Sequence, residues 1–167
     1  MLVCKISRIF VYTFKRKYAL MKILDKYNNV IVEGDDNQFP SVKDLLLYAV
    51  KKHMDMSFAN LSGTNLDNII INDVIMTYAN LSNASLVGTI ISNSDISHSV
   101  LYKAVMDKAT VVNSNCSYCD FTKTVLNSTS FKQSILNSAY FSNSNISSLD
   151  IYKCITDEDT KFICCKK

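Results

Sequence analysis

The 167-residue sequence contains only three glycines and one proline, and it has no tryptophan. Sheets built from tight hairpins need glycine-rich turns, so this scarcity argues against an ordinary antiparallel β-protein. No stretch approaches 18 consecutive apolar residues, and the short apolar run near the N-terminus has no signal-peptide cleavage site. We therefore expect a cytoplasmic protein without a membrane partner, in which the six cysteines are reduced thiols.

The sequence also lacks a large excess of charge of either sign and recognisable catalytic groups. The net charge is +3, which is too small to indicate that the whole chain binds nucleic acid. His53 and His98 are the only histidines, and neither belongs to a nucleophile motif or a metal-binding motif. The sequence has no glycine-rich phosphate loop. It therefore predicts a protein that is not an enzyme, with no catalytic residues, no cofactor and no metal.

What the sequence does contain is an apolar residue at every fifth position. From Met56 to Ile151, all twenty positions of this series are apolar, and the residue two places earlier is Ala, Ser, Thr or Cys in sixteen cases. With 48% apolar residues, chance produces such a series about once in a million times or less. The main predicted core centres are Leu61, Leu66, Ile71, Leu81, Leu86, Ile91, Ile96, Leu101, Phe121, Leu126, Phe131, Leu136, Phe141 and Ile146.

Strand alternation converts this five-residue period into a structure. Residues two apart on an extended segment point the same way, so each centre and the small residue before it point inward together. Four such sides close a coil of about 20 residues, and successive coils stack through a parallel ladder of backbone hydrogen bonds. Asn, Ser and Asp beside the corners bond local backbone groups in place of glycine. We predict an all-β solenoid, a quadrilateral β-helix of about five coils, over residues 54–153.

The repeats resemble a known family. The stretches "FANLSGTNL", "YANLSNASL" and "CDFTKTVL" are similar to those of pentapeptide-repeat proteins, and the resemblance covers residues 54–153. It implies a right-handed quadrilateral β-helix. It implies much less about function, because repeat scaffolds carry many roles.

Both ends of the solenoid need covering, and the sequence offers segments for this. Residues 21–53 predict a cap, with a hairpin around Asn28-Asn29 and a short α-helix that Ser41 begins. A similar preface is found in small phage-encoded members of the family. Residues 1–20 form an N-terminal extension, which is either part of the native product or the result of an upstream start, since Met21 stands where such chains begin.

After Ile151 the count by fives fails, because it places Thr156 and Lys161 where hydrophobic residues belong. We therefore assign residues 154–167 to a C-terminal cap or tail. In one interpretation Phe162 and Ile163 fold over the last coil. In the other, that end stays open and forms a weak dimer or binds a partner.

Residues 20 apart should stack in columns on the outside. One column holds Phe58, Tyr78, His98 and Tyr118, and the next corner places Lys103 over Lys123, with Lys108 one corner further on. These residues form the candidate interaction stripe. The rings either stabilise neighbouring coils or anchor a protein partner. The stacked lysines are either a solvated face or a site beside an anion.

Two further patterns have more than one interpretation. Cys116 and Cys119 have the spacing of a zinc or redox motif, but both occupy inward positions, which favours buried core thiols. The outward pairs Ile70/Ile90 and Val105/Val125 reflect either β-propensity or a surface on which residues 1–20 pack.

Three functions remain open. The first is a non-enzymatic scaffold that binds a host or phage protein. Another is a role as a virion or assembly component. The remaining one, which the family resemblance suggests, is mimicry of DNA at a type II topoisomerase such as gyrase. Mimicry needs an acidic rod, whereas residues 54–153 carry seven aspartates and five lysines, and residues 1–53 carry ten basic and five acidic residues. Direct binding of nucleic acid is not expected.

Overall fold

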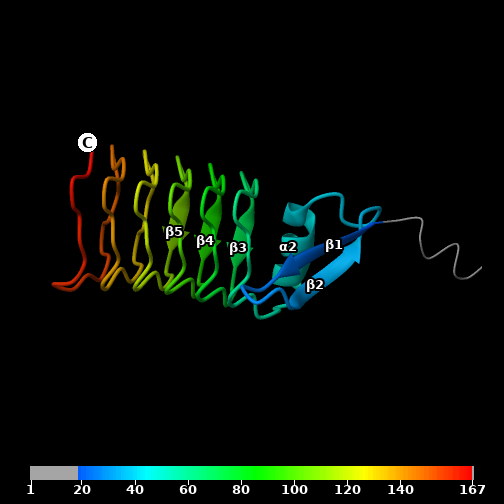
Figure 1. Ribbon diagram of the computed structural model, residues 1–167. Coiled ribbons are helices and arrows are strands. Elements are labelled where there is room, and N and C mark those ends of the chain that lie inside the picture. Colours follow the sequence, from blue (N-terminus) through cyan, green and yellow to red (C-terminus); the bar gives the residue numbers. More distant parts are fainter. Residues whose placement is uncertain (1–18, 167) are drawn as a thin grey trace, which may run out of the picture.

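The computed structural model describes residues 19–166. An N-terminal unit lies at one end of a stack of coils, and the C-terminus lies at the other end (Figure 1). The predicted N-terminal extension lies outside the described residues, except for its last two. In chain order the elements are β1 (Leu20–Leu24), β2 (Val30–Asp35), α2 (Val42–Lys51), β3 (Ile70–Asn72), β4 (Ile90–Ser92) and β5 (Thr110–Val112).

The N-terminal unit is a hairpin with a helix packed on it. Strands β1 and β2 pair antiparallel, with Ile23 opposite Val32. The turn between them is closed by Asp25, whose carboxylate accepts hydrogen bonds from the backbone N–H groups of Tyr27 and Asn29, both at 2.8 Å. Asn28 takes a positive φ of 68° in this turn, a conformation that asparagine tolerates better than most residues.

Helix α2 begins at Ser41, whose hydroxyl accepts a hydrogen bond from the Asp44 N–H at 3.2 Å. Its apolar face, formed by Leu45, Leu46, Ala49 and Val50, is buried. The helix contacts β1, β2 and β3, and the Lys43 ammonium donates to the Asp67 carbonyl in the first coils. The helix therefore covers the beginning of the solenoid and separates its core from water.

The remaining chain winds into coils with four sides. Parallel bridges join residues 20 apart, as in the series Asn60, Asn80, Val100, Asp120 and Tyr140. Equivalent bridges run along the other sides, and β3, β4 and β5 pair in parallel on one of them. The structure is thus the all-β quadrilateral solenoid that the five-residue period predicts.

The core is the axis of this solenoid. The fourteen predicted centres are all buried apart from Ile146, which is partly buried near the open end. Phenylalanines dominate the later coils. The rings of Phe121 and Phe141 stack with centroids 4.7 Å apart, and Phe162 continues the stack 4.6 Å from Phe141. Stacked rings of this kind add stability beyond the area they bury.

The small inward residues have a second role besides fitting against the wall. Their hydroxyl and thiol groups donate to centre carbonyls of the preceding coil, as in Thr124 to Leu101 at 2.8 Å and Thr129 to Met106 at 2.7 Å. Cys119 donates in the same way to the Ile96 carbonyl at 3.1 Å. Burial raises the pKa of the Cys119 thiol to about 12, so this thiol stays protonated and serves as a core residue.

The corners explain how a chain with three glycines can turn so often. The side chain of an asparagine or aspartate before a centre accepts a hydrogen bond from the backbone N–H of the residue after that centre. The Ser82 N–H donates in this way to the Asn80 side-chain oxygen at 3.0 Å, which confirms the predicted local bonding. The residue two places after each centre takes a positive φ at all twenty corners from Phe58 to Lys153. Only two of these twenty residues are glycines, Gly63 and Gly88, and none is Val, Ile or Thr.

The C-terminal end corrects the sequence interpretation. The coil geometry continues past residue 153, with parallel bridges from Ile135 to Ile155, from Tyr140 to Lys161 and from Asn145 to Lys166. The spacing changes from 20 to 21 because one extra residue is accommodated in the turn that precedes Lys161. A strict count by fives therefore misplaced the last centre, which is Phe162 and not Lys161.

Candidate interaction surface

The most distinctive outer feature is the ring column, which we define as Phe58, Tyr78, His98 and Tyr118. Successive ring centroids are 5.1, 4.5 and 4.7 Å apart, and the planes of neighbouring rings differ by 13°, 8° and 2°. Each ring comes from the same corner of a different coil, so the repeat of the backbone sets the spacing. Tyr78 is 47% exposed and Tyr118 is 58% exposed. The column is therefore a continuous aromatic edge that faces solvent.

The backbone holds these rings rigidly. All four residues have φ between 58° and 63°, and each N–H donates to a carbonyl of the next coil, as Tyr118 does to Asn137 at 2.9 Å. A left-handed conformation costs a non-glycine residue about 1–2 kcal/mol. Aromatic pairs recover about 0.5–1.5 kcal/mol each, which is a similar amount. The three stacked pairs thus offset part of the cost of placing four bulky residues at these corners.

One end of the column is covered by the N-terminal hairpin. The Lys26 ammonium, from the turn between β1 and β2, lies 4.5 Å from the centroid of the Phe58 ring. Attraction between a cation and an aromatic face is favourable at this distance. Sequence reasoning missed Lys26, because it lies 32 positions before Phe58 and only the docking of the hairpin on the first coil brings them together.

The predicted lysines divide into two groups. Lys103 and Lys123 both lie over the ring of Tyr102, at 5.2 and 5.6 Å from its centroid, and the Lys123 ammonium donates to its hydroxyl at 3.4 Å. The hydrogen bond from Lys123 lowers the pKa of Tyr102. An external anion is therefore not needed to explain the stacked lysines. Lys108 belongs to the next corner and makes no contact with Tyr102 or the ring column.

Sequence reasoning also missed Tyr102. A signal was present, because Tyr102 directly precedes Lys103 in the sequence. The outward pairs Ile70/Ile90 and Val105/Val125 do form parallel-bridged columns, with Ile70 58% exposed. The segment proposed to pack on them, residues 1–20, lies outside the described residues except for its last two.

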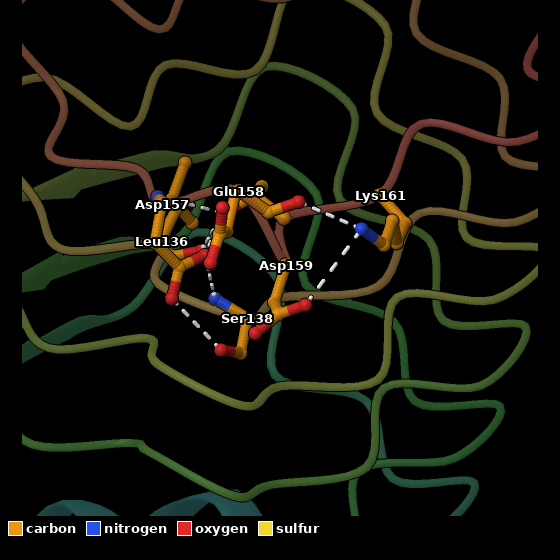
Figure 2. Close-up of polar contacts among 7 residues, drawn as sticks. Leu136, Ser138, Asp157, Glu158, Asp159 and Lys161 are labelled. Atoms are coloured by element: carbon orange, nitrogen blue, oxygen red, sulfur yellow. Dashed lines mark hydrogen bonds and ion pairs between the residues drawn. The ribbon is translucent and has the colours of Figure 1, made fainter.

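Beyond Tyr118, the same corner of the next coil carries Ser138, which is bonded to an acidic turn, defined as Asp157, Glu158 and Asp159 (Figure 2). The Asp157 carboxylate accepts from the Ser138 N–H at 2.7 Å and from the Ser138 hydroxyl at 2.9 Å. Those bonds, with the backbone bond as the largest cause, lower the pKa of Asp157 to about 2. The Lys161 ammonium donates to the Glu158 carbonyl at 2.7 Å and lies 3.8 Å from the Asp159 carboxylate.

No group of three or more His, Cys, Asp or Glu side chains among residues 19–166 could hold a metal ion. Within the same residues, no helix has the length and apolar character needed to cross a membrane. The arrangement that stands out is thus a surface of rings and charges, which is suited to binding.

Comparisons with known proteins agree with this geometry. The family model described as pentapeptide repeats matches residues 55–93 and 114–150, with eight copies of the repeat. No protein of curated function matches the chain in sequence. Among solved structures, HetL, a pentapeptide repeat protein involved in heterocyst differentiation regulation in the cyanobacterium Nostoc sp. strain PCC 7120, is 18% identical with a TM-score of 0.57. That match covers 68% of this chain and 51% of HetL, so the chain spans about half of HetL's length.

Two further structures are also similar. Rfr23, a pentapeptide repeat protein from the cyanobacterium Cyanothece 51142, is 18% identical over 70% of this chain and 96% of its own, with a TM-score of 0.33. QnrB1, a plasmid-mediated fluoroquinolone resistance protein, is 18% identical over 64% of this chain and 76% of its own, with a TM-score of 0.24. The matched stretches are similar to pentapeptide repeats, and the residues between and beyond them have the same backbone geometry.

Proposed function

We propose that this chain is a non-enzymatic protein-interaction scaffold and that the ring column is its binding surface. The observation that carries the proposal is the set of four outward rings in register, of which Tyr78 and Tyr118 are about half exposed. Tyrosine is enriched among the residues that dominate binding energy at protein interfaces. A rigid edge of rings also loses little conformational entropy when a partner binds.

The charges near the column favour a protein over a nucleic acid. Lys103 and Lys123 are directed to Tyr102, and the acidic turn is bonded to Ser138, which follows Tyr118 at the same corner of the next coil. Nucleic acids are bound mainly through many contacts from basic side chains to phosphates. A surface with so few free cations, next to three acidic side chains, suits a protein partner better.

The biological setting is a finer part of the same proposal. We place the protein among phage accessory proteins that act on a host or phage protein in the host cytoplasm. Support comes from the N-terminal arrangement, in which a hairpin and α2 precede the first coil, and from the Asn-, Lys-, Ile- and Tyr-rich composition. In this view residues 21–53 form the cap of the solenoid and residues 1–20 form an extension.

The test compares proteins captured from a lysate of the natural host by three forms of the chain. The first is the wild type, the second carries Tyr78→Ser and Tyr118→Ser, and the third carries Tyr152→Ser as a control. Tyr152 is 60% exposed and lies outside the ring column, so the third form removes an exposed ring without touching the column. We expect a protein that the wild type and the control capture and the double variant does not.

Thermal unfolding of the same three forms separates binding from stability. A purely structural column predicts a lower Tm for the double variant together with an unchanged set of captured proteins. That result would remove the ring column as a binding surface.

A further inference from the structure

The ring column ends at Tyr118, although the coils of the solenoid continue beyond it. In the next coil, the corner that corresponds to Tyr118 carries Ser138. The hydrogen bond from the Tyr118 N–H to the Asn137 carbonyl shows that the two coils are adjacent. The rings above are 4.5 to 5.1 Å apart, so a serine at this corner leaves one stacking step without a planar group. Among residues 19–166, no second ring and no ammonium group covers this face of Tyr118.

The opposite end of the same column shows what covers a terminal ring in this molecule. There the Lys26 ammonium lies over Phe58 at 4.5 Å from the ring centroid. Tyr152 is covered in the same way, since the Lys153 ammonium lies 5.2 Å from the centroid of its ring. Tyr118, which is 58% exposed, has no such cation. Its free face thus resembles half of a cation–aromatic contact.

Charge at this end of the column also selects for a cation. The Asp157 carboxylate accepts hydrogen bonds from Ser138 (Figure 2), so a negative charge lies next to the residue that follows Tyr118 at the same corner. Glu158 and Asp159 follow it, and Lys161 contacts only Asp159 and a backbone carbonyl. Phosphate groups would be repelled here, whereas a positively charged group would be attracted from both sides.

We propose that the free face of Tyr118, together with the acidic turn, binds an arginine side chain of the protein partner. The guanidinium group takes the stacking step that Ser138 leaves open and lies beside Asp157. Arginine fits better than lysine because its guanidinium is planar, stacks on aromatic faces and pairs with carboxylates through several N–H groups. This inference rests on the proposed binding role of the ring column, and it adds the chemistry of the partner.

The test is a nuclear magnetic resonance titration of the full chain with tyrosine rings labelled with carbon-13. The probe is a blocked Gly-Arg-Gly peptide, and the control peptide carries citrulline, which has nearly the same shape without the charge. We expect the arginine peptide to shift the Tyr118 ring signals about threefold more than the citrulline peptide. The Tyr152 ring, already covered by Lys153, should respond equally little to both.

Two variants localise the response. Ser138→Tyr places a ring at a corner where Tyr78 and Tyr118 already show that tyrosine is accommodated, so we expect it to fold, to stack on Tyr118 and to abolish the shift. Glu158→Gln should weaken the response without removing it. Asp157 is left in place because it holds the turn through Ser138. Thermal unfolding of each variant confirms that it is folded.

Equal shifts with both peptides, or a full response in Ser138→Tyr, would overturn the proposed arginine site. So would a Tyr118 shift with a short thymidine oligonucleotide that exceeds the shift with the arginine peptide, since that result indicates stacking of a base. If the peptide titration fails while the change of Tyr78 and Tyr118 still abolishes capture of a partner, the ring column remains the binding surface and only the arginine site is wrong.

Discussion

At the scale of single residues, the corner position with positive φ is where the sequence is under the strongest local constraint. Eighteen of the twenty corner residues are not glycine, yet all twenty adopt this conformation. β-branched residues are the least tolerant of positive φ, which accounts for their absence from these positions. The five-residue period predicted the inward positions, but it gave no direct signal of this backbone state, because tyrosine, lysine and serine all occur there.

Ser128 offers a test of this constraint, because it is exposed and has φ of 54°. We expect Ser128→Val to lower the free energy of unfolding by about 1–2 kcal/mol, and Ser128→Gly to leave it unchanged or slightly higher. Thr110→Val, at an extended position in β5 below Ile90, is the matched control and should cost less than about 0.5 kcal/mol. Chemical denaturation measures all three. A harmless Ser128→Val would mean that positive φ at the corners carries little cost.

At the scale of elements, the N-terminal hairpin and helix gave strong sequence signals, whereas the last coil did not. Asn28 in a turn, Ser41 as a helix cap and helical spacing of apolar residues are local features that can be read from adjacent letters. The one-residue insertion before Lys161 is local too, but its effect on the pairing of the last coil cannot be read from adjacent residues. Whether the chain resumes its register depends on contacts between neighbouring coils, such as the hydrogen bond of 3.0 Å that the Thr160 hydroxyl donates to the Leu136 carbonyl, 24 residues earlier.

Asp157 makes the last coil sensitive to acid. The pKa of this carboxyl is lowered to about 2, mainly by the bond from the Ser138 N–H, while an unfolded chain keeps the usual value of 3.8. Its stabilising contribution is therefore fully present above pH 4 and is lost as the pH falls through 2. We expect the amides of Lys161 and Lys166 to lose protection from hydrogen exchange at pH 2 relative to that of Leu126.

The comparison with Asp157→Asn isolates this carboxyl from the others. The variant should show a weakened last coil already at pH 6, and its ratio of protection between Lys161 and Leu126 should change less on acidification. If wild type and variant respond to pH alike, another acid group controls the end of the solenoid.

At the scale of the whole molecule, the two ends of the rod differ. The N-terminal end is covered by α2, whereas large apolar residues are exposed at the C-terminal end, including Ile151 at 41%, Phe162 at 40% and Ile163 at 43%. A pocket of about 430 Å³ between Ile146, Leu149, Ile151 and Phe162 opens there. Exposed apolar surface of this kind favours association.

Residues 19–166 present one exposed apolar end, which allows two chains to pair but does not allow a filament. We expect sedimentation equilibrium to show a weak monomer–dimer equilibrium that depends on concentration, and Ile163→Ser to shift it toward the monomer. Tyr27→Ser, at the opposite end, is the control and should leave the equilibrium unchanged. Higher oligomers of the wild type would show that the covered N-terminal end also takes part in association.

Net charge along the rod bears on the alternative of DNA mimicry. Residues 54–153 carry seven aspartates against five lysines, far from the dense negative charge of duplex DNA. We therefore expect no inhibition of gyrase supercoiling at micromolar protein, measured on a relaxed plasmid. Inhibition that persists in Tyr78→Ser with Tyr118→Ser would revive mimicry and place the active surface elsewhere on the rod.

The hairpin and α2 cover only the first coil, so the molecule can assemble from its N-terminal end. The hairpin and α2 leave the ribosome before any repeat, and together they present an edge to which the first coil can bond. Each completed coil is then the template for the next, so residues need to find partners only 20 positions back. Synthesis and assembly can thus proceed in the same direction, and an interrupted translation product should hold folded coils up to a frayed end.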